Sequence, residues 1–538
     1  MNAMRINGDT ALAWGAIEAG VSCVTGYPGS PGTGTFTALS DTAAEYGHDA
    51  EWCLNERIAL DVAAGVSQGG RRVLVCMKSV GMNVALDTLM VLNMTGVHAG
   101  LVILMGDDPG AWGSQNEQDG RFFAPLAEIP MLEPATPAEG RRMMRWAFDF
   151  SESFRTVVIL RITRSFSVCE ADLPPVRRPA ALQALEPDRE PMRWISSLAN
   201  CIPNHRRLHR NLKDISQSFE DVPFNRIDGA GELGVIASGF VHTKLQDALE
   251  GADISGLRRL KLASVYPLPC GLITDFLKQC RQVLVLEEVD PYLEDGIKTI
   301  GYDAGVTPTV IGKRSGHVPG EGELFRWQMQ QALTACLPDL KPKRVFTEAG
   351  WQEEKPYRKS HCAGCPYNEI LAALREEAAA LGQKPFLTAD PGCVVIAARH
   401  LDTKLCMGSA VGAALGLRKA GVVERAVAIT GDSAFYHSSV NALIHARSTG
   451  ADLLLVVLDN DGSLTTGGQP TPDRGVPVNG KPGPVVAINE LAAACGVDAI
   501  WTVEETDPEA RMRRIFREAL QTDGLGLVTI RRRCEPVD

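Results

Sequence analysis

Residues 428–469 read AITGDSAFYHSSVNALIHARSTGADLLLVVLDNDGSLTTGGQ, and this stretch decides the fold. An apolar run, 427–429, leads into Gly431-Asp432-Ser433, and a second run, 453–458, ends at Asp459-Asn460-Asp461-Gly462. Two apolar runs separated by a helix-like stretch predict a strand–helix–strand unit of a parallel sheet. Ligands bind beyond the carboxyl ends of such strands, so we expect Asp432 and Asn460 to lie side by side in a binding site.

Oxygen-bearing side chains at this edge predict a magnesium ion. Asp432 and Asn460 offer hard carboxylate and amide oxygens. A Mg²⁺ ion held by one or two such groups usually carries a substrate or cofactor phosphate as well. The alternative is a plain strand–turn–helix in which Asp432 only caps the helix.

The composition predicts an ordinary globular chain. Its 538 residues, 45% hydrophobic and 22% charged, suggest about three or four domains. The net charge of −11 argues against nucleic acid as the main partner. The sequence has no apolar run of membrane-span length and no signal-peptide core in its first residues, so we expect no membrane span and a cytoplasmic location. Most of the fourteen cysteines stand singly in apolar runs and are interpreted as buried thiols.

Three doubly wound α/β domains are predicted along the chain, over residues 1–175, 231–344 and 345–538. The region 176–230, rich in Pro, Arg and Asn, is interpreted as a linker with one helix over 206–216. The predicted strands outside the opening stretch are 22–25, 73–77, 100–105, 233–238, 283–289 and 386–388.

Several polar features follow the strands of the first domain. The Gly- and Pro-rich turn 26–31 is either a ligand platform or a rigid connection. Glu56 opens an Ala- and Gly-rich helix, where a glutamate usually only complements the helix dipole. Lys78 ends another strand, and the polar loop 114–119, which includes Asn116, is either solvated or part of an active site or interface.

A C-x-x-C motif, Cys362 and Cys365, precedes a predicted helix over 369–381. It suits a zinc knuckle, a thioredoxin-like dithiol or half of an iron–sulfur site. Zinc would need a second C-x-x-C, which the sequence lacks, and a thioredoxin motif should follow a strand in a small domain. A cluster needs two further thiolates, for which Cys393 and Cys534, each after a predicted strand, are candidates.

Taken together, these pieces resemble the indolepyruvate:ferredoxin oxidoreductase alpha subunit family, within the 2-oxoacid:ferredoxin oxidoreductase superfamily. The Gly-Asp-Ser…Asn pattern itself resembles the thiamine diphosphate (TPP) motif, with Ser433 in place of its second glycine. The matching words are TGYPGSP (25–31), LNERIALDVAAG (54–65), MKSVGMNVALDTL (77–89), GDDPGAWGSQNEQDGRFF (106–123), RRLHR (206–210), CAGCP (362–366), CMGSAVGAALG (406–416), GDSAFYHSS (431–439) and LDN (458–460).

The resemblance implies TPP and Mg²⁺ as cofactors. The first domain would bind the pyrimidine ring of TPP and the third its diphosphate. The second would resemble the transketolase C-terminal domain. Glu56 would activate the cofactor, and Asp432, Asn460 and the carbonyl of Gly462 would hold Mg²⁺. The implied cofactor-binding residues are Tyr27, Pro28, Glu56, Met407, Gly408, Gly431, Asp432, Ser433, Asn460 and Gly462. The implied catalytic or pocket residues are Glu56, Lys78, Asn116, His437 and Gln469, with helix capping as the alternative role of His437.

The resemblance also implies one [4Fe-4S] cluster, held by Cys362, Cys365, Cys393 and Cys534. The expected reaction is oxidative decarboxylation of a 2-oxoacid, similar to an aryl pyruvate, to an acyl-CoA. Coenzyme A would be the second substrate, and electrons would leave through the cluster to an acceptor protein. The expected assembly is a homodimer of this chain within a hetero-oligomer that contains a gamma-type subunit, which is the beta subunit of the indolepyruvate enzymes.

The sequence departs from the family in two ways. The family's alpha subunit continues into a ferredoxin-like domain, whereas this sequence has no C-x-x-C-x-x-C run, so we expect a short form. Ser79, Tyr367 and Gly468 stand where the family has histidines. One alternative is therefore a non-oxidative TPP decarboxylase or carboligase. Another is a degenerate scaffolding subunit, against which the intact cofactor residues argue.

Overall fold

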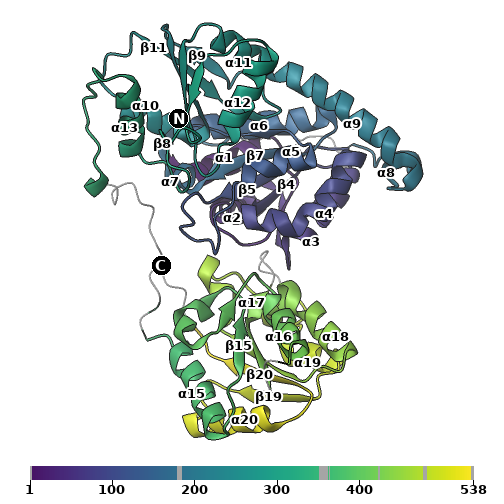
Figure 1. Cartoon of the computed structure of the whole chain (residues 1–538). Coiled ribbons are helices and arrows are strands. Elements are labelled where there is room, and N and C mark those ends of the chain that lie inside the picture. The colour runs from purple at the N-terminus through teal and green to yellow at the C-terminus, as the bar shows by residue number, and fades with distance from the viewer. Residues whose placement is uncertain are drawn as a thin grey trace. The chain divides into compact units, whose positions relative to one another are not determined.

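The computed structural model describes residues 3–177, 185–350, 362, 364–421, 425–476 and 482–534. The chain forms two compact units, Met1–Arg358 and Lys359–Asp538. Each unit consists of helices packed around twisted sheets (Figure 1). The predicted α/β class is confirmed, because most neighbouring strands in the three larger sheets are parallel.

A seven-stranded sheet lies at the centre of the first unit. Its order is β12-β6-β7-β5-β4-β2-β3, and every neighbouring pair is parallel except β12 with β6. β4, β5 and β7 are buried along their whole length, as expected for parallel strands covered on both faces. The strands are β2 (Cys23–Gly26), β3 (Asp49–Trp52), β4 (Val73–Lys78), β5 (Leu101–Asp107), β6 (Met131–Leu132), β7 (Val158–Thr163) and β12 (Ser264–Tyr266).

The helices around this sheet begin at side-chain caps. The side chain of Asn7 accepts the Thr10 N–H at the start of α1, and Asn55 accepts the Ile58 N–H at the start of α3. The second cap makes Glu56 the first residue of α3, as predicted. The helices are α1 (Gly8–Glu18), α2 (Thr33–Tyr46), α3 (Glu56–Gln68), α4 (Ser79–Thr95), α5 (Phe123–Ala127), α6 (Pro137–Phe154) and α7 (Arg164–Val168). A separate antiparallel pair joins β1 (Met4–Asn7) and β8 (Glu170–Leu173).

A second, five-stranded sheet in the first unit has the order β14-β13-β10-β11-β9. Only β9 is antiparallel to its neighbour. One hydrophobic core contains residues of both sheets, such as Met131 of β6 and Ile236 of β10. The strands are β9 (Arg226–Asp228), β10 (Leu233–Ser238), β11 (Leu257–Leu262), β13 (Gln282–Leu286) and β14 (Thr309–Ile311). The helices are α8 (Pro191–Trp194), α9 (Leu198–Phe219), α10 (Gly239–Ala248), α11 (Cys270–Leu277), α12 (Tyr292–Asp303) and α13 (Arg326–Cys336).

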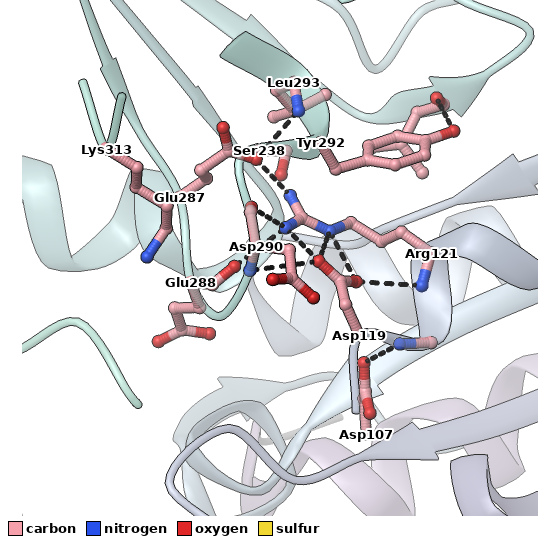
Figure 2. A network of polar contacts seen from close by, with 12 residues as sticks. Asp107, Asp119, Arg121, Ser238, Glu287, Glu288, Asp290, Tyr292, Leu293 and Lys313 are labelled. Carbon is pink, nitrogen blue, oxygen red and sulfur yellow. Dashed lines mark hydrogen bonds and ion pairs between the residues drawn. The ribbon is translucent and has the colours of Figure 1, made fainter. Parts of the chain in front are cut away.

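A buried ionic network connects the two sheets of the first unit (Figure 2). Arg121, which follows the loop after β5, is only 1% exposed. Its guanidinium donates to the carboxylates of Asp119 (2.9 Å from Nε) and Glu287 (2.7 Å) and to the Glu288 carbonyl (2.7 Å). These anions keep the pKa of Arg121 raised despite its burial, so the cation persists inside the protein.

This network also corrects one strand prediction. The strand predicted over 283–289 ends at Leu286. Beyond that residue Glu287 accepts from Arg121, and Glu288 accepts from the buried Lys244 at 2.9 Å. Val289 then adopts a positive φ of 60°. The apolar pattern of the run could not reveal this bend, because tertiary partners cause it.

The second unit is a doubly wound domain around a six-stranded, all-parallel sheet with the order β16-β15-β17-β18-β20-β19. One hydrophobic core lies under α15 and α20, and another under α16, α18 and α19, so helices cover both faces. The strands are β15 (Phe386–Ala389), β16 (Thr403–Lys404), β17 (Ala426–Gly431), β18 (Leu453–Asp459), β19 (Ala499–Val503) and β20 (Leu525–Arg531). The helices are α15 (Tyr367–Ala380), α16 (Ser409–Lys419), α17 (Asp432–Ala434), α18 (Val440–Ser448), α19 (Ile488–Ala494) and α20 (Glu509–Gln521).

The predicted linker region contains ordered elements. The helix expected over 206–216 is part of the longer α9, and β9 also falls between 176 and 230. β12, from the predicted second domain, pairs with β6 of the first. The domain boundaries given above stay a prediction. In the part of the chain that the structure describes, no helix is both long and apolar enough to span a membrane.

Candidate active site

The carboxyl edge of β17 and β18 brings the predicted metal ligands together. The two strands are parallel neighbours, with Gly431 beside Leu458, so Asp432 and Asn460 emerge at the same edge. Both side chains are buried. The Gly462 N–H donates to Asp432 Oδ2 at 2.9 Å, and the Ser433 N–H donates to Oδ1 at 2.7 Å. The predicted adjacency of these residues is confirmed.

The electrostatics of this edge fit a divalent cation. Burial raises the pKa of Asp432 to about 7, and the neighbouring carboxylates of Asp459 and Asp473 add to the rise. One carboxylate oxygen of Asp473 is buried without a hydrogen-bond partner among the described residues. Asp459 pairs with Arg531 at 3.6 Å, whereas no ion pair of Asp432 or Asp473 is found among the described residues. Burying charged carboxylates is unfavourable unless a cation neutralises them. Carboxylate and amide oxygens are also the ligand types that Mg²⁺ prefers.

Asp390, which was not predicted as a site residue, organises the same edge from the next strand. This residue follows β15 and accepts from the Ala410 N–H at 2.9 Å and from the Thr430 hydroxyl at 2.6 Å. It thereby fixes the N-terminal end of α16 beside β17. Gly408, just before α16, has φ +78°, and a Cβ there would lie 2.3 Å from the Ser438 Cβ. The predicted cofactor residues Met407 and Gly408 therefore belong to a turn that only glycine allows.

A π-helical turn, Phe435–Ser439, connects α17 to α18 and carries His437. Such turns are frequent at functional sites because they redirect side chains within a helix. His437 is buried, and its Nδ1 lies 2.6 Å from the Ser438 hydroxyl. Its catalytic role stays a prediction. Gln469 accepts from the Thr466 hydroxyl at 2.7 Å, in the loop that follows Gly462.

Four cysteines gather near this edge. Asn460 Nδ2 donates to Cys393 Sγ at 3.5 Å. Burial, and after it the charges of other cysteines of the set, raise the pKa of both Cys393 and Cys534 to about 11. The charge of Cys365 raises the pKa of both residues, and the charge of Cys362 raises that of Cys534. These thiols lie close enough to disfavour one another's ionisation. Such a group fits a site where a cationic cluster would hold the cysteines as thiolates.

The cysteine set does not have the geometry of a single-ion site. Among the described residues, the one group of metal-ligating atoms that all lie within 4.8 Å of one another is found elsewhere, in the first unit. A cluster of four iron atoms binds each thiolate through a different iron and therefore accepts a wider spacing. Tyr367 lies against the set, because Cys534 and Cys393 add to the rise that burial causes in its pKa. Its buried hydroxyl has no partner among the described residues.

In the first unit, Glu56 lies against the start of α4. Its side chain is 6% exposed. A Cβ on Gly81 would lie 2.5 Å from both Cγ and Oε1 of Glu56, so only glycine leaves room for this carboxylate. Tyr27 and Pro28, which follow β2, are also buried. A buried glutamate in a tight cradle fits the predicted contact with an aminopyrimidine ring.

Lys78 and Asn116 have different environments. Lys78 Nζ donates to Asp108 Oδ2 and to the Gly113 carbonyl, both at 3.1 Å, and burial lowers its pKa. The second oxygen of Asp108 is buried without a partner among the described residues. Asn116 is exposed and donates to Gln118 at 3.3 Å. The structure therefore brings Lys78, but not Asn116, into a buried polar site.

Comparison with known proteins defines the class. The family model for the thiamine pyrophosphate enzyme C-terminal TPP-binding domain matches residues 391–530, which include β17, β18 and their carboxyl edge. The chain therefore contains a TPP-binding domain. A solved 2-oxoglutarate:ferredoxin oxidoreductase from Magnetococcus marinus, with 2-oxoglutarate, coenzyme A and succinyl-CoA bound, has a TM-score of 0.51 to this chain. The two sequences are 14% identical, and the match covers 62% of this chain and 65% of the other chain, which shows a shared fold.

Full-length relatives define the family. Indolepyruvate oxidoreductase subunit IorA of Pyrococcus abyssi is 32% identical over 98% of this chain and 85% of that protein. The subunit of the same name from Methanothermobacter marburgensis is 34% identical over 98% of this chain and 86% of that protein. The chain belongs to the indolepyruvate oxidoreductase subunit IorA family. The prediction of a TPP-dependent oxidoreductase is thereby confirmed.

Proposed function

We propose that this chain catalyses the TPP-dependent oxidative decarboxylation of a 2-oxoacid, an aryl pyruvate, to an acyl-CoA, with electrons leaving through one [4Fe-4S] cluster to an acceptor protein. The names of the relatives support an indolepyruvate-like substrate. One observation carries the oxidative part of the proposal. The thiol of Cys393 contacts Asn460, so the cysteine set and the metal edge of the TPP-binding domain are adjacent.

Asp432, Asn460 and the Gly462 carbonyl would hold Mg²⁺, and the turn at Met407 and Gly408 would support the diphosphate. When bound, TPP supplies an electron sink that makes loss of carbon dioxide from a 2-oxoacid feasible. The chain's contribution is electrostatic. Three acidic side chains, Asp432, Asp459 and Asp473, lie close together there, and a bound cation would favour their ionised form.

In the first unit, Glu56 would hydrogen-bond the cofactor's pyrimidine ring and hold a proton there. Lys78 would bind the substrate carboxylate. Its ammonium is buried and paired with Asp108, which fixes its position before substrate arrives. His437 would act on a proton at the metal edge, and Asn116, which is exposed, would contribute a polar group to the substrate pocket.

Cys362, Cys365, Cys393 and Cys534 would hold the cluster, which when bound supplies a one-electron acceptor. Burial raises the pKa of Cys365, Cys393 and Cys534, which favours their thiols over thiolates in the absence of iron. Iron binding would therefore release protons. The relatives are named as subunits, which supports a partner subunit. That this partner is of the gamma type, and that this chain forms a homodimer within the hetero-oligomer, are further parts of the proposal. A cytoplasmic location remains part of the proposal.

An oxygen-free assay tests the function. Chain and partner subunit are supplied with TPP, Mg²⁺, coenzyme A, a viologen dye and either indolepyruvate, phenylpyruvate or 2-oxoglutarate. We expect dye reduction and an aryl acyl-CoA with the first two substrates. Cys393→Ser should abolish dye reduction, whereas Cys495→Ser, a half-buried cysteine of the opposite sheet face, should leave it unchanged. Aldehyde formation without dye reduction would instead establish the non-oxidative alternative.

A further inference from the structure

Three side chains of the first unit, outside the candidate active site, converge on one point. His205 and His209 stand one turn apart on α9. Glu128, directly after α5, adopts a left-handed φ of 53° that turns the chain there. His205 Nε2 lies 3.0 Å from one oxygen of the Glu128 carboxylate, and His209 Nε2 lies 2.8 Å from the other. The two imidazole rings are 4.2 Å apart.

The ligand atoms of this trio all lie within 4.8 Å of one another. In a tetrahedral zinc site with bonds of 2.0–2.1 Å, ligand atoms are separated by about 3.3 Å. His205 Nε2 and His209 Nε2 lie 3.0 and 2.8 Å from two different oxygens of the carboxylate, and both distances are close to this value. Two histidines at i and i+4 on one helix present both Nε2 atoms to the same side.

The charge of the trio also suits a cation. In the described parts of the chain, no lysine or arginine forms an ion pair with Glu128; its ionic contacts are the two histidines. The carboxylate is half-buried, and its position between the two imidazoles leaves it available to a metal ion that they also bind. Two imidazoles and one carboxylate are a donor set that favours zinc, nickel or copper over Mg²⁺ and Ca²⁺.

We propose that Glu128, His205 and His209 form a binding site for a divalent transition-metal ion of the zinc class, with water in the remaining coordination position. The ion would connect α9 to the end of α5, two segments that are far apart in the sequence. Such a connection stabilises the folded state, because the unfolded chain cannot hold the three ligands together. None of the three residues belongs to the proposed cofactor or cluster sites.

Zinc-edge anomalous diffraction from crystals of the anaerobically purified protein, equilibrated with ZnCl₂ in slight molar excess, tests the site directly. We expect an anomalous peak bounded by the three side chains. Zinc bound to free cysteine thiols, which occur in both units, would give peaks at those sulfur atoms and not one bounded by these three side chains. The absence of a peak at Glu128, His205 and His209 would overturn the proposal and leave a hydrogen-bonded clamp without metal.

Thermal unfolding with and without zinc gives a second test. Zinc should raise the unfolding temperature of the first unit by a few degrees in the wild type and in His317→Gln, which removes an exposed histidine outside the trio. The shift should disappear in His209→Gln and Glu128→Gln. An equal zinc shift in His209→Gln and the wild type would contradict the proposal. Turnover of the variants should match the wild type, since no proposed catalytic residue is changed.

Discussion

At the scale of single residues, Gly81 controls the position of the proposed cofactor-activating carboxylate. A Cβ at this position would lie 2.5 Å from two atoms of Glu56. We therefore predict that Gly81→Ala displaces the carboxylate and lowers the rate of 2-oxoacid turnover by about 100-fold, the scale expected when a catalytic group is misplaced by roughly 1 Å. The measurement is steady-state turnover, with far-ultraviolet circular dichroism to confirm that the fold is retained.

Gly65→Ala is the matched control for this substitution. Gly65 lies in α3, and an added Cβ would meet no heavy atom within 4 Å. Alanine has a higher helix propensity than glycine, so this variant should be as active as the wild type and slightly more stable. Equal activity of Gly81→Ala and Gly65→Ala would show that the position of Glu56 does not limit the reaction.

His242 provides a pH-dependent prediction. It is buried, and its Nδ1 has no partner among the described residues. Burial lowers its pKa to about 4, with further lowering from Lys261, Arg226 and Arg259 and an opposing effect from Asp228. Since the unfolded pKa is about 6.5, protonation favours the unfolded chain, and stability is lost as pH falls from about 6.5 towards 4.

We expect His242→Gln to lose less stability than the wild type between pH 7 and pH 4.5, because glutamine does not titrate. Urea unfolding midpoints at the two pH values give the comparison. The four neighbouring charged groups are present in both proteins, so their own titration largely cancels. Identical pH dependence of the two midpoints would show that His242 does not titrate in this range.

Several site residues could be predicted from the sequence and several could not. Asp432 and Asn460 were predictable because each ends an apolar run that is long enough to be a buried strand. Asp390 and Asp473 have no comparable signal: Asp390 gains its role from tertiary hydrogen bonds with Ala410 and Thr430, and Asp473 from its approach to Asp432. The Asp390-Pro391-Gly392 turn after a predicted strand was the only available sign.

At the scale of elements, Arg121 holds the loop after β5 against the end of β13. We predict that Arg121→Met lowers the free energy of unfolding by about 3–5 kcal/mol, because Asp119 and Glu287 would remain buried without their cation. Urea unfolding measures the change. Arg57→Met is the matched control, since Arg57 pairs with Asp61 at 3.8 Å on the surface, where such pairs contribute less than about 1 kcal/mol.

A loss below about 1 kcal/mol for Arg121→Met would contradict this view of the network. Adding Glu287→Gln to Arg121→Met should recover part of the lost stability, because it removes one of the uncompensated charges. This double variant separates the electrostatic contribution from the loss of packing. Packing is lost because the Arg121 guanidinium lies over the Tyr292 ring, 5.1 Å from its centroid.

Elements were predictable where local pattern and burial agree. β10 begins and ends as predicted, β4 and β18 are each one residue longer than predicted, and β17 is three residues longer. The end of β13 and the length of α9 could not be predicted, because partners that are distant in the sequence determine them. Glu287 leaves the strand to reach Arg121, and α9 extends beyond 206–216 while its side chains contact Thr95 and Glu128.

At the scale of the whole molecule, the sequence predicts three α/β domains, and the structure has three larger sheets in two compact units. The first two sheets share a hydrophobic core, the Arg121 network and the β12–β6 pair. No sequence pattern reveals that long-range association. The 30–34% identity to IorA proteins, over about 85% of their length, extends the family assignment across all three sheets.

We propose that electrons leave the active site through a cluster held by Cys362, Cys365, Cys393 and Cys534. Iron and acid-labile sulfide per chain, measured on protein purified without oxygen, test it most directly. We predict about four of each, as one [4Fe-4S] cluster requires, and their loss in Cys393→Ser. Protein that binds TPP but contains neither iron nor sulfide would contradict the claim and leave non-oxidative decarboxylation or carboligation as its chemistry.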